Sequence, residues 1–304
     1  MTSKWFILGA GAIGNLWGCN LSYMNHPVTL ILKNTDKLKQ YQQAGKALTL
    51  NKKRYLVDAE LADNNTLIEQ LLITTKSTDT VEAVTSIKDR IAEHAKIIVL
   101  QNGMGTQQWV SDTFPAADVN WASTTDGAWL ASPFTVVHAG KGVTRIGSIT
   151  RSVHHADKDS WTDKLGCGFL AVEADEDIRA TLWRKLAINC CINPLTATYH
   201  CKNGALIQHP EYLAEMSLIA TEVTAVAASL GMSLFESPLI EQACQVAELT
   251  ASNYSSMLQD VKHKRKTEID YITGYLCTLA KKQGIAVPTN EKYLRKIKKI
   301  EDFI

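Results

Sequence analysis

The sequence shows neither an excess of one charge nor a long apolar run. Its 304 residues carry 32 Lys and Arg against 31 Asp and Glu, so nothing in the charge balance favours a nucleic acid or another polyanion as a partner. No segment approaches the ~20 apolar residues that a membrane-spanning helix needs. We therefore expect binding neither to nucleic acid nor to a membrane.

Cysteine is present, but not in a metal-binding or disulfide pattern. The seven cysteines are scattered and odd in number, and neither C-x-x-C nor H-E-x-x-H occurs, so no metal site is predicted. Free thiols suit a reducing compartment and predict a cytoplasmic protein. Lys4–Ile13 has some features of a signal peptide, but its glycines have a better explanation. His154 and His155 lie in the polar segment Arg151–Asp163, for which we expect a solvated helix or loop.

The overall composition is that of a globular protein. Hydrophobic residues make up 45% of the chain and charged residues 21%, which argues against intrinsic disorder. The length predicts about two domains, each large enough to bury a core.

The first half begins with a strand, a glycine-rich turn, a helix and a second strand. Apolar runs at Trp5–Leu8 and Val28–Leu32 predict the strands, and Asn15–Tyr23 predicts the helix. The turn is a G-x-G-x-x-G at Gly9–Gly14. This order within about thirty residues is the context that a dinucleotide-binding turn requires. The alternative is a merely tight strand-to-helix turn.

Each glycine of this turn has its own physical task. Gly9 makes the turn tight, Gly11 lets the backbone approach a pyrophosphate, and Gly14 lets the helix pack on the strand. The pyrophosphate then lies at the helix N-terminus, where free N–H groups and the helix dipole favour an anion. We predict cofactor contacts from Gly9, Ala10, Gly11, Ala12, Ile13 and Gly14.

Lys33, directly after the second strand, bears on the choice of cofactor. A protein that prefers NAD usually has an acid about twenty residues after the glycines, where this chain has a cation. A cation can pair with a 2′-phosphate, so Lys33 favours NADP. The competing acid is Asp36, which we interpret as the N-cap of a helix over Lys37–Ala44.

Two further polar residues follow predicted strands. Lys76 follows Leu71–Thr75, and Asn102 follows Ile97–Leu100. Ligands of open parallel sheets lie beyond the carboxyl ends of the strands, so both residues are candidate cofactor contacts. The alternatives are a solvated loop lysine and an ordinary Asn-Gly turn.

A helix apolar on nearly all sides is predicted over Leu182–Asn193, which indicates burial. Lys185, Asn189 and Asn193 recur at i, i+4 and i+8 and therefore share one face. Buried polar groups need partners, which are either other side chains or a small oxygen-rich ligand. Pro194 disfavours the helical conformation at the preceding residue, so we expect the helix to end or kink there.

The second half shows helical periodicity and few strand signals. Glu211–Leu230, Ser237–Tyr254, Thr267–Lys282 and Glu291–Ile304 predict helices. The basic run Lys262–Lys266 is interpreted as a solvated connection.

Strands are also predicted in Ala122–Ala128 and Phe134–Ile149, extending the first sheet toward an edge. The domain boundary is expected near residue 170, giving domains 1–170 and 171–304. The predicted fold class is α/β, with a Rossmann-type, mostly parallel sheet domain followed by an all-α C-terminal domain.

Several segments of the chain stand in an order that is typical of one enzyme family. They are Gly9–Gly14, Gln101–Gly105, Leu182–Asn189, Ile192–Ala197, Ser255–Asp260, Glu268–Ile272 and Gly284–Pro288. On these segments, nearly the whole chain resembles the ketopantoate reductase (2-dehydropantoate 2-reductase) family.

The resemblance implies NADPH-dependent reduction of 2-dehydropantoate to (R)-pantoate, a step of pantothenate and coenzyme A synthesis. It implies that Lys185 is catalytic and acts as general acid. The implied substrate contacts are Asn189, Asn193, Asn203 and Ser256. The implied cofactor contacts are Gly9–Gly14, Lys33, Lys76, Asn102, Ala128 and Glu268, of which Asn102 and Glu268 are also candidates to reach the substrate.

We expect the reaction in a cleft between the domains, in a monomer or homodimer. One alternative is a related NADP-dependent dehydrogenase of another small 2-oxo acid. The other is a non-catalytic NADP-binding sensor, which would not need Lys185 together with Asn189 and Asn193.

Overall fold

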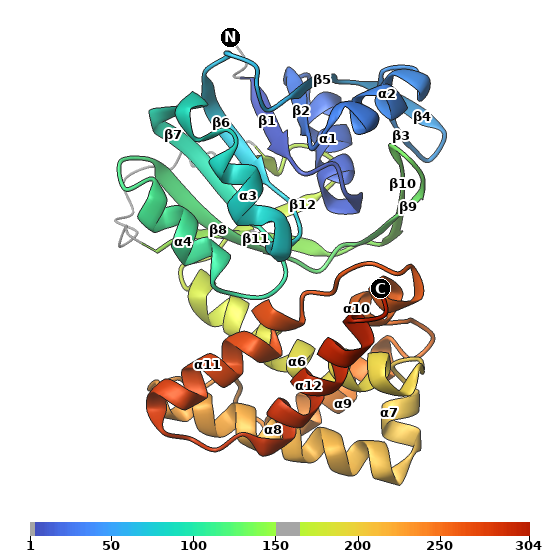
Figure 1. Cartoon of the computed structure of the whole chain (residues 1–304), viewed down its shortest axis with the longest axis vertical. Helices are drawn as coiled ribbons and strands as arrows, with labels where there is room; N and C mark the ends of the chain where they lie inside the picture. Colours follow the sequence, from blue (N-terminus) through green and yellow to red (C-terminus); the bar gives the residue numbers. More distant parts are fainter. Residues whose placement is uncertain (1–3, 150–164) are drawn as a thin grey trace. The chain divides into compact units, whose positions relative to one another are not determined.

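The computed structural model describes residues 4–149 and 165–304. Its contacts divide the chain into two units. The first contains residues 1–101 and 106–179, and the second contains residues 102–105 and 180–304. The first unit is built of strands and helices, and the second is helical (Figure 1). The polar segment Arg151–Asp163, with its two histidines, lies outside the described residues.

Among the described residues, the first unit contains an eight-stranded sheet in the order β12-β11-β8-β7-β6-β1-β2-β5. Its strands are β1 (Trp5–Leu8), β2 (Val28–Leu32), β5 (Asp58–Leu61), β6 (Ile68–Ile73), β7 (Ile91–Leu100), β8 (Asp118–Thr124), β11 (Val143–Ser148) and β12 (Ala171–Ala174). Neighbours from β5 to β8 pair in parallel, and β11 joins β8 antiparallel. The predicted mostly parallel, Rossmann-type sheet is confirmed.

The described part of the first unit also contains a four-stranded sheet, ordered β4-β3-β10-β9. Its strands are β3 (Ala47–Leu50), β4 (Lys53–Leu56), β9 (Gly127–Ser132) and β10 (Thr135–Gly140). The prediction that both later segments extend one sheet is therefore wrong in part. Strands β8 and β11 belong to the large sheet, whereas a hairpin of β9 and β10 turns away to pair with β3.

Helix α1 (Ala12–Tyr23) packs against strands of both sheets, including β1, β2, β3 and β10. Its residues from Gly14 to Leu21 are all buried. A Cβ at Gly18 would lie 2.6 Å from Cδ1 of Leu48 on β3. The helix that follows the glycine turn is thus part of the core of the first unit. The other α-helices in the described part of the unit are α2 (Thr35–Gln43), α3 (Thr80–Thr85) and α4 (Thr106–Thr113).

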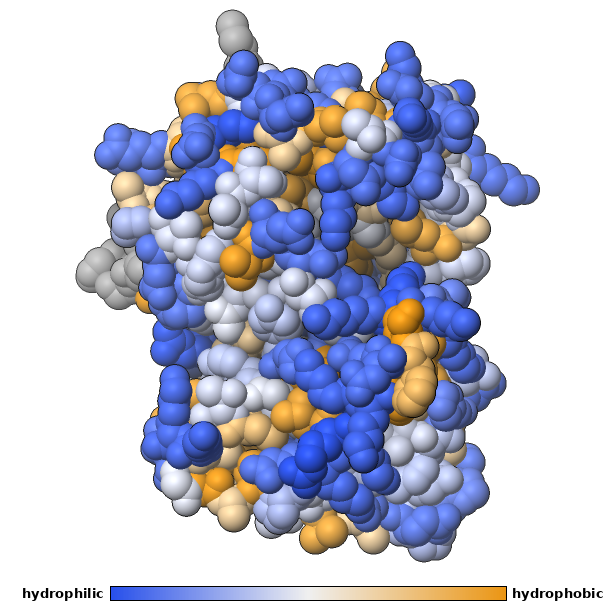
Figure 2. All heavy atoms as spheres, viewed as in Figure 1, coloured by the Kyte–Doolittle hydropathy of each residue, from blue (hydrophilic) through white to orange (hydrophobic). Residues whose placement is uncertain are grey.

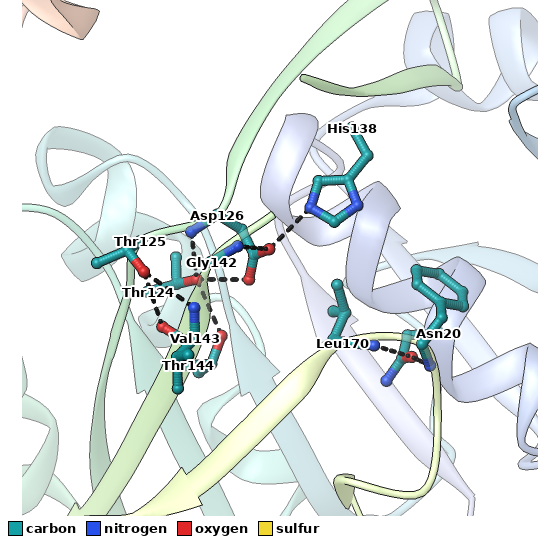
Figure 3. Close-up of polar contacts among 10 residues, drawn as sticks. Asn20, Thr124, Thr125, Asp126, His138, Gly142, Val143, Thr144 and Leu170 are labelled. Atoms are coloured by element: carbon teal, nitrogen blue, oxygen red, sulfur yellow. Dashed lines mark hydrogen bonds and ion pairs between the residues drawn. The ribbon is translucent and has the colours of Figure 1, made fainter. Parts of the chain in front are cut away.

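The first unit extends beyond the boundary predicted near residue 170, to residue 179. Strand β12 pairs in parallel with β11 and so completes the large sheet. The side-chain Oδ1 of Asn20 accepts hydrogen bonds from the backbone N–H groups of Phe169 (2.8 Å) and Leu170 (3.1 Å), and Figure 3 shows the contact to Leu170. These long-range contacts hold the segment before α6 to the sheet domain.

The second unit is helical, and within residues 180–304 the structure shows no strand. Its helices are α6 (Ile178–Tyr199), α7 (Ala205–Gln208), α8 (Pro210–Ser229), α9 (Leu239–Leu249), α10 (Ser256–Lys262), α11 (Thr273–Gln283) and α12 (Pro288–Glu301). The carboxylate of Glu222 on α8 accepts hydrogen bonds from the N–H groups of Thr289 and Asn290, capping α12. Hydrophilic residues gather over α12 on the face shown in Figure 2.

Two local predictions are corrected. The N-cap of α2 is Asn34, whose Oδ1 accepts a hydrogen bond from Lys37 N (2.9 Å), and not Asp36. Either short polar side chain suits a cap, so composition could not separate them. Of the two outcomes predicted at Pro194, an end or a kink, the end is wrong, because helix α6 continues to Tyr199. Burial of the surrounding turn compensates for the single backbone hydrogen bond that proline removes.

No helix among the described residues combines the length and the apolar character that crossing a membrane would require.

Candidate active site

The glycines of the first turn meet different surroundings. Gly9 has φ +110°, and a Cβ there would lie 2.5 Å from the Thr75 backbone nitrogen. A Cβ at Gly14 would overlap the carbonyl oxygen of Gly9, which also accepts a hydrogen bond from Thr74 Oγ1 (2.8 Å). Gly11, by contrast, has no atom within 4 Å of its would-be Cβ. Gly9 and Gly14 are therefore required by the protein's own backbone, whereas Gly11 leaves space for a ligand.

The N-terminus of α1 suits an anion. Gly11 is its N-cap, no side chain caps the helix, and the first turn contains no acidic residue. The N–H groups of the first turn, from Ala12 to Gly14, have no carbonyl partner within the helix. Together with the helix dipole they fit a dinucleotide pyrophosphate.

Lys33 and Lys76 lie at the carboxyl edge of the parallel strands, after β2 and β6. Lys33 is exposed, and its Nζ lies 3.8 Å from Oδ1 of Asp79. The loop that carries Lys76 is held by Gln101, at the end of β7. Gln101 Nε2 donates to the carbonyl of Thr75 (2.7 Å), and its Oε1 accepts from Thr106 Oγ1 (2.8 Å). Gln101 therefore fixes the backbone that leads to Lys76.

A buried acid–imidazole pair, Asp126 and His138, lies beside the strand that carries Ala128. Asp126 Oδ1 lies 2.7 Å from His138 Nε2 and accepts a hydrogen bond from Gly142 N (2.9 Å), while its Oδ2 accepts from Thr124 Oγ1 (3.0 Å) (Figure 3). The side chains of Asp126 and His138 are only 2% and 8% exposed. This network joins β8, β9, β10 and the start of β11, and it fixes the backbone on which Ala128 lies.

In the second unit, α6 carries the polar line that the sequence predicts. Asn193 is 6% exposed, and Lys185 and Asn189 are partly buried. On the remaining circumference, Leu186 and Ala187 are buried. Lys185, Asn189 and Asn193 therefore form a line of polar side chains that is largely shielded from water, whereas Arg184 in the same segment is exposed.

Burial lowers the pKa of the Lys185 ammonium to about 8, because removal from water disfavours the charged form. The carboxylate of Glu268 acts in the opposite direction and raises this pKa. An amine with such a pKa is still mostly protonated at neutral pH and releases its proton more readily than an ordinary lysine. This is the behaviour that a general acid needs.

The same burial acts on two thiols of α6. It raises the pKa of Cys190 and of Cys191 well above the ordinary value. Both side chains are fully buried and neither forms a disulfide. They are packing residues, in agreement with the predicted free thiols.

The loop Asn102–Gly105 belongs to the second unit, although the strand before it belongs to the first. Met104 N donates to the carbonyl of Tyr271 (2.8 Å). Gly103 has φ +78°, and a Cβ there would lie 2.5 Å from the same carbonyl oxygen. Asn102 is thereby held in the same unit as Lys185, through the segment that follows Glu268.

Ser256 is placed by its neighbour Ser255. Ser255 is the N-cap of α10, accepting a hydrogen bond from Leu258 N (3.1 Å), and its Oγ also accepts one from Thr196 Oγ1 on α6 (2.7 Å). Ser256 is the exposed first residue of α10. The start of α10 is therefore tied to α6, one turn beyond Asn193.

Asn203 has one polar atom without a partner. Its backbone N–H donates to Asn253 O (3.0 Å), and its Nδ2 donates to Thr250 Oγ1 (2.9 Å). Its buried Oδ1 finds no donor within the part of the chain that the structure describes. An unpaired buried acceptor costs free energy, so this oxygen is a candidate to accept a hydrogen bond from a ligand.

Two family models match the two parts of the chain. Residues 5–151 match the family model described as ketopantoate reductase PanE/ApbA, and residues 177–301 match that of its C-terminal part. A 2-dehydropantoate 2-reductase of Vibrio cholerae is 35% identical over 298 residues, covering 97% of each chain. The chain belongs to the ketopantoate reductase family.

Solved structures show the same architecture. A PanE/ApbA family ketopantoate reductase from Ralstonia eutropha is 26% identical, covers 99% of each chain and has a TM-score of 0.86. A ternary structure of D-mandelate dehydrogenase with NADH and anilino(oxo)acetate has a TM-score of 0.90 over 99% of each chain. At 24% identity, the second likeness establishes the fold alone.

The structure divides the predicted site residues of this family member between its two units. The first unit contains Gly9–Gly14, Lys33, Lys76 and Ala128, and the second contains Lys185, Asn189, Asn193, Asn203, Ser256, Asn102 and Glu268. The roles of these residues stay predictions.

Sequence reasoning missed Asp79, Gln101 and Ser255, which contact predicted site residues or the loops that carry them. Gln101 and Ser255 stand beside Asn102 and Ser256 within the family's motifs, and that adjacency was the available signal. Asp79 had none.

Proposed function

We propose that this protein catalyses the NADPH-dependent reduction of 2-dehydropantoate to (R)-pantoate, a step of pantothenate and coenzyme A synthesis. The observation that carries the proposal is Lys185, a shielded ammonium with a pKa of about 8, aligned with Asn189 and Asn193. Its support is the 35% identity to a 2-dehydropantoate 2-reductase over nearly the whole chain.

When bound, a nicotinamide cofactor would supply a hydride for the C2 carbon of the ketone. Negative charge then develops on the ketone oxygen. The Lys185 ammonium donates a hydrogen bond to that oxygen, stabilises the developing charge and transfers a proton to complete the alcohol. Glu268 keeps enough of the lysine protonated, because its carboxylate raises the pKa that burial lowers.

The other polar residues of the second unit orient the substrate. Asn189 and Asn193 both donate and accept hydrogen bonds, which suits a hydroxyl and a carbonyl. Asn203 offers its unpaired Oδ1 to a hydroxyl. Ser256 and Asn102 suit the carboxylate because neither adds negative charge. Orientation of this kind lowers the entropic part of the barrier.

The first unit holds the dinucleotide in this proposal. The turn Gly9–Gly14 and the N-terminus of α1 bind the pyrophosphate. Lys33 pairs with the 2′-phosphate, and Lys76 and the backbone at Ala128 contribute further contacts to the dinucleotide. We also propose a cytoplasmic location, on the basis of the free thiols.

The decisive experiment is a spectrophotometric assay of NADPH oxidation with 2-dehydropantoate, run beside NADH and a panel of small 2-oxo acids. We expect the highest kcat/KM for NADPH with 2-dehydropantoate. A higher kcat/KM for another 2-oxo acid would replace the substrate. NADPH binding without turnover of any acid would instead indicate a sensor.

A further inference from the structure

One ion pair of the first unit is left unexplained by the proposed reaction. The Lys33 ammonium and the Asp79 carboxylate lie 3.8 Å apart, and their side chains are 63% and 48% exposed. Lys33 follows β2, and Asp79 ends a short 3₁₀ segment after β6. Both residues therefore lie at the carboxyl edge of the sheet, where a dinucleotide is bound in folds of this type.

Helix capping does not account for the Asp79 side chain. The residue occupies the N-cap position of α3, where an aspartate usually accepts a hydrogen bond from the helix backbone. Its side chain makes no such bond here, and its backbone lies in the right-handed helical region (φ −100°, ψ −7°), which is unusual for a cap. The carboxylate is directed to Lys33 instead.

We propose that Asp79 is a specificity-determining residue that limits the preference for a 2′-phosphorylated dinucleotide. The inference rests on the proposed function in one respect, which is that Lys33 faces the 2′ position of the adenosine. The carboxylate of Asp79 competes with the 2′-phosphate for the lysine ammonium. It also repels the phosphate, because two negative groups then share one cation.

The nature of the cation strengthens this argument. A lysine offers one compact charge, whereas an arginine could bind a carboxylate and a phosphate with different N–H groups. Asp79 therefore offsets the positive charge that Lys33 brings to the 2′ position. We therefore expect NADPH to be preferred over NADH by a modest factor only, and both to be bound.

The test is the variant Asp79→Asn, which removes the charge and keeps the shape. Isothermal titration calorimetry measures binding of adenosine 2′,5′-bisphosphate and of adenosine 5′-monophosphate, neither of which needs turnover. We expect the affinity ratio of the first ligand to the second to rise roughly three- to tenfold. The gain should shrink in high salt, because both groups are exposed.

A matched control is Asp89→Asn, the same charge change at an exposed residue just before β7, at the amino edge of the sheet. It should leave the ratio unchanged, and Lys33→Gln should lower it. An unchanged ratio in Asp79→Asn, with unchanged melting temperature, would overturn the proposal. So would an equal gain for both ligands. Since no 2-oxo acid is involved, a failure of the proposed reductase activity would leave this result intact.

Discussion

The two units present their candidate site groups in different ways. In the first unit the candidate binding groups are mainly backbone N–H groups at the start of a buried helix, and glycines make room around them. In the second unit they are side chains along one face of α6 and on segments packed against it. A site made of backbone N–H groups requires glycine at the positions where a Cβ atom would clash with the protein or block the ligand. A side-chain site depends on the chemistry of each group and on how far it is shielded from water.

The largest expected effect tests the side-chain half of this comparison. Lys185→Ala removes both the charge beside the ketone oxygen and the proton donor, so we expect kcat to fall by about 10²- to 10⁴-fold while the dinucleotide still binds. Steady-state kinetics and calorimetry measure the two quantities separately. Arg184→Ala, at the exposed neighbouring cation, is the control and should keep most of the turnover. Near-normal kcat in Lys185→Ala would remove lysine from the mechanism.

A pair of glycine variants tests the backbone half. Gly14→Ala places a Cβ against the Gly9 carbonyl and should lower the free energy of unfolding by about 1–3 kcal/mol. Gly11→Ala meets open space at φ −78°, so its melting temperature should not change. We expect it instead to weaken dinucleotide binding by about tenfold or more, because the new methyl occupies the approach to the pyrophosphate. Unchanged binding in Gly11→Ala would place the dinucleotide elsewhere.

A third variant asks whether the first unit also depends on a side-chain network. His138→Ala leaves the Asp126 carboxylate buried without its imidazole partner, and we expect a loss of about 3 kcal/mol in the free energy of unfolding. Urea denaturation measures it. His94→Ala, at an exposed histidine of the same unit, should stay within roughly 0.5 kcal/mol of the wild type. Equal stabilities of the two variants would contradict the structural role of the pair.

The smallest effect concerns pH. If the Lys185 ammonium is the acid, kcat for reduction should fall as pH rises through about 8, since the protonated form is lost there. Glu268→Gln removes the carboxylate that raises this pKa, so the fall should move to lower pH. The control Glu291→Gln, an exposed acid on α12, should leave the profile in place. If the fall in kcat moved to higher pH in Glu268→Gln, the carboxylate of Glu268 would not be raising the pKa of Lys185.

Local patterns predicted the regular parts of the fold well, for physical reasons. The turn Gly9–Gly14 between a strand and a helix has strict steric demands. The burial of most residues in Leu182–Asn193 follows from its apolar composition. Contacts distant in sequence could not be foreseen in the same way. Nothing near Asn20 indicates that it binds the backbone of Phe169 and Leu170, just before strand β12 joins the large sheet.

The same distinction applies to the candidate site. The spacing of Lys185 and the two asparagines predicted a shared face, because helix geometry alone determines it. The ion pair of Lys33 with Asp79 depends on two loops that follow different strands, and residue spacing carries no information about it. The continuation of α6 through Pro194 likewise reflects packing around the helix, which outweighs the local preference.

The thiols of α6 have a consequence for the chemistry next to them. The exclusion of water that makes the lysine easier to deprotonate makes Cys190 and Cys191 harder to deprotonate. The ketone of a 2-oxo acid is an electrophile, and a thiolate nearby would add to it and form a dead-end hemithioketal. A helix that keeps its sulfur atoms protonated can therefore carry two cysteines within a turn of the proposed Lys185 site without trapping a 2-oxo acid there.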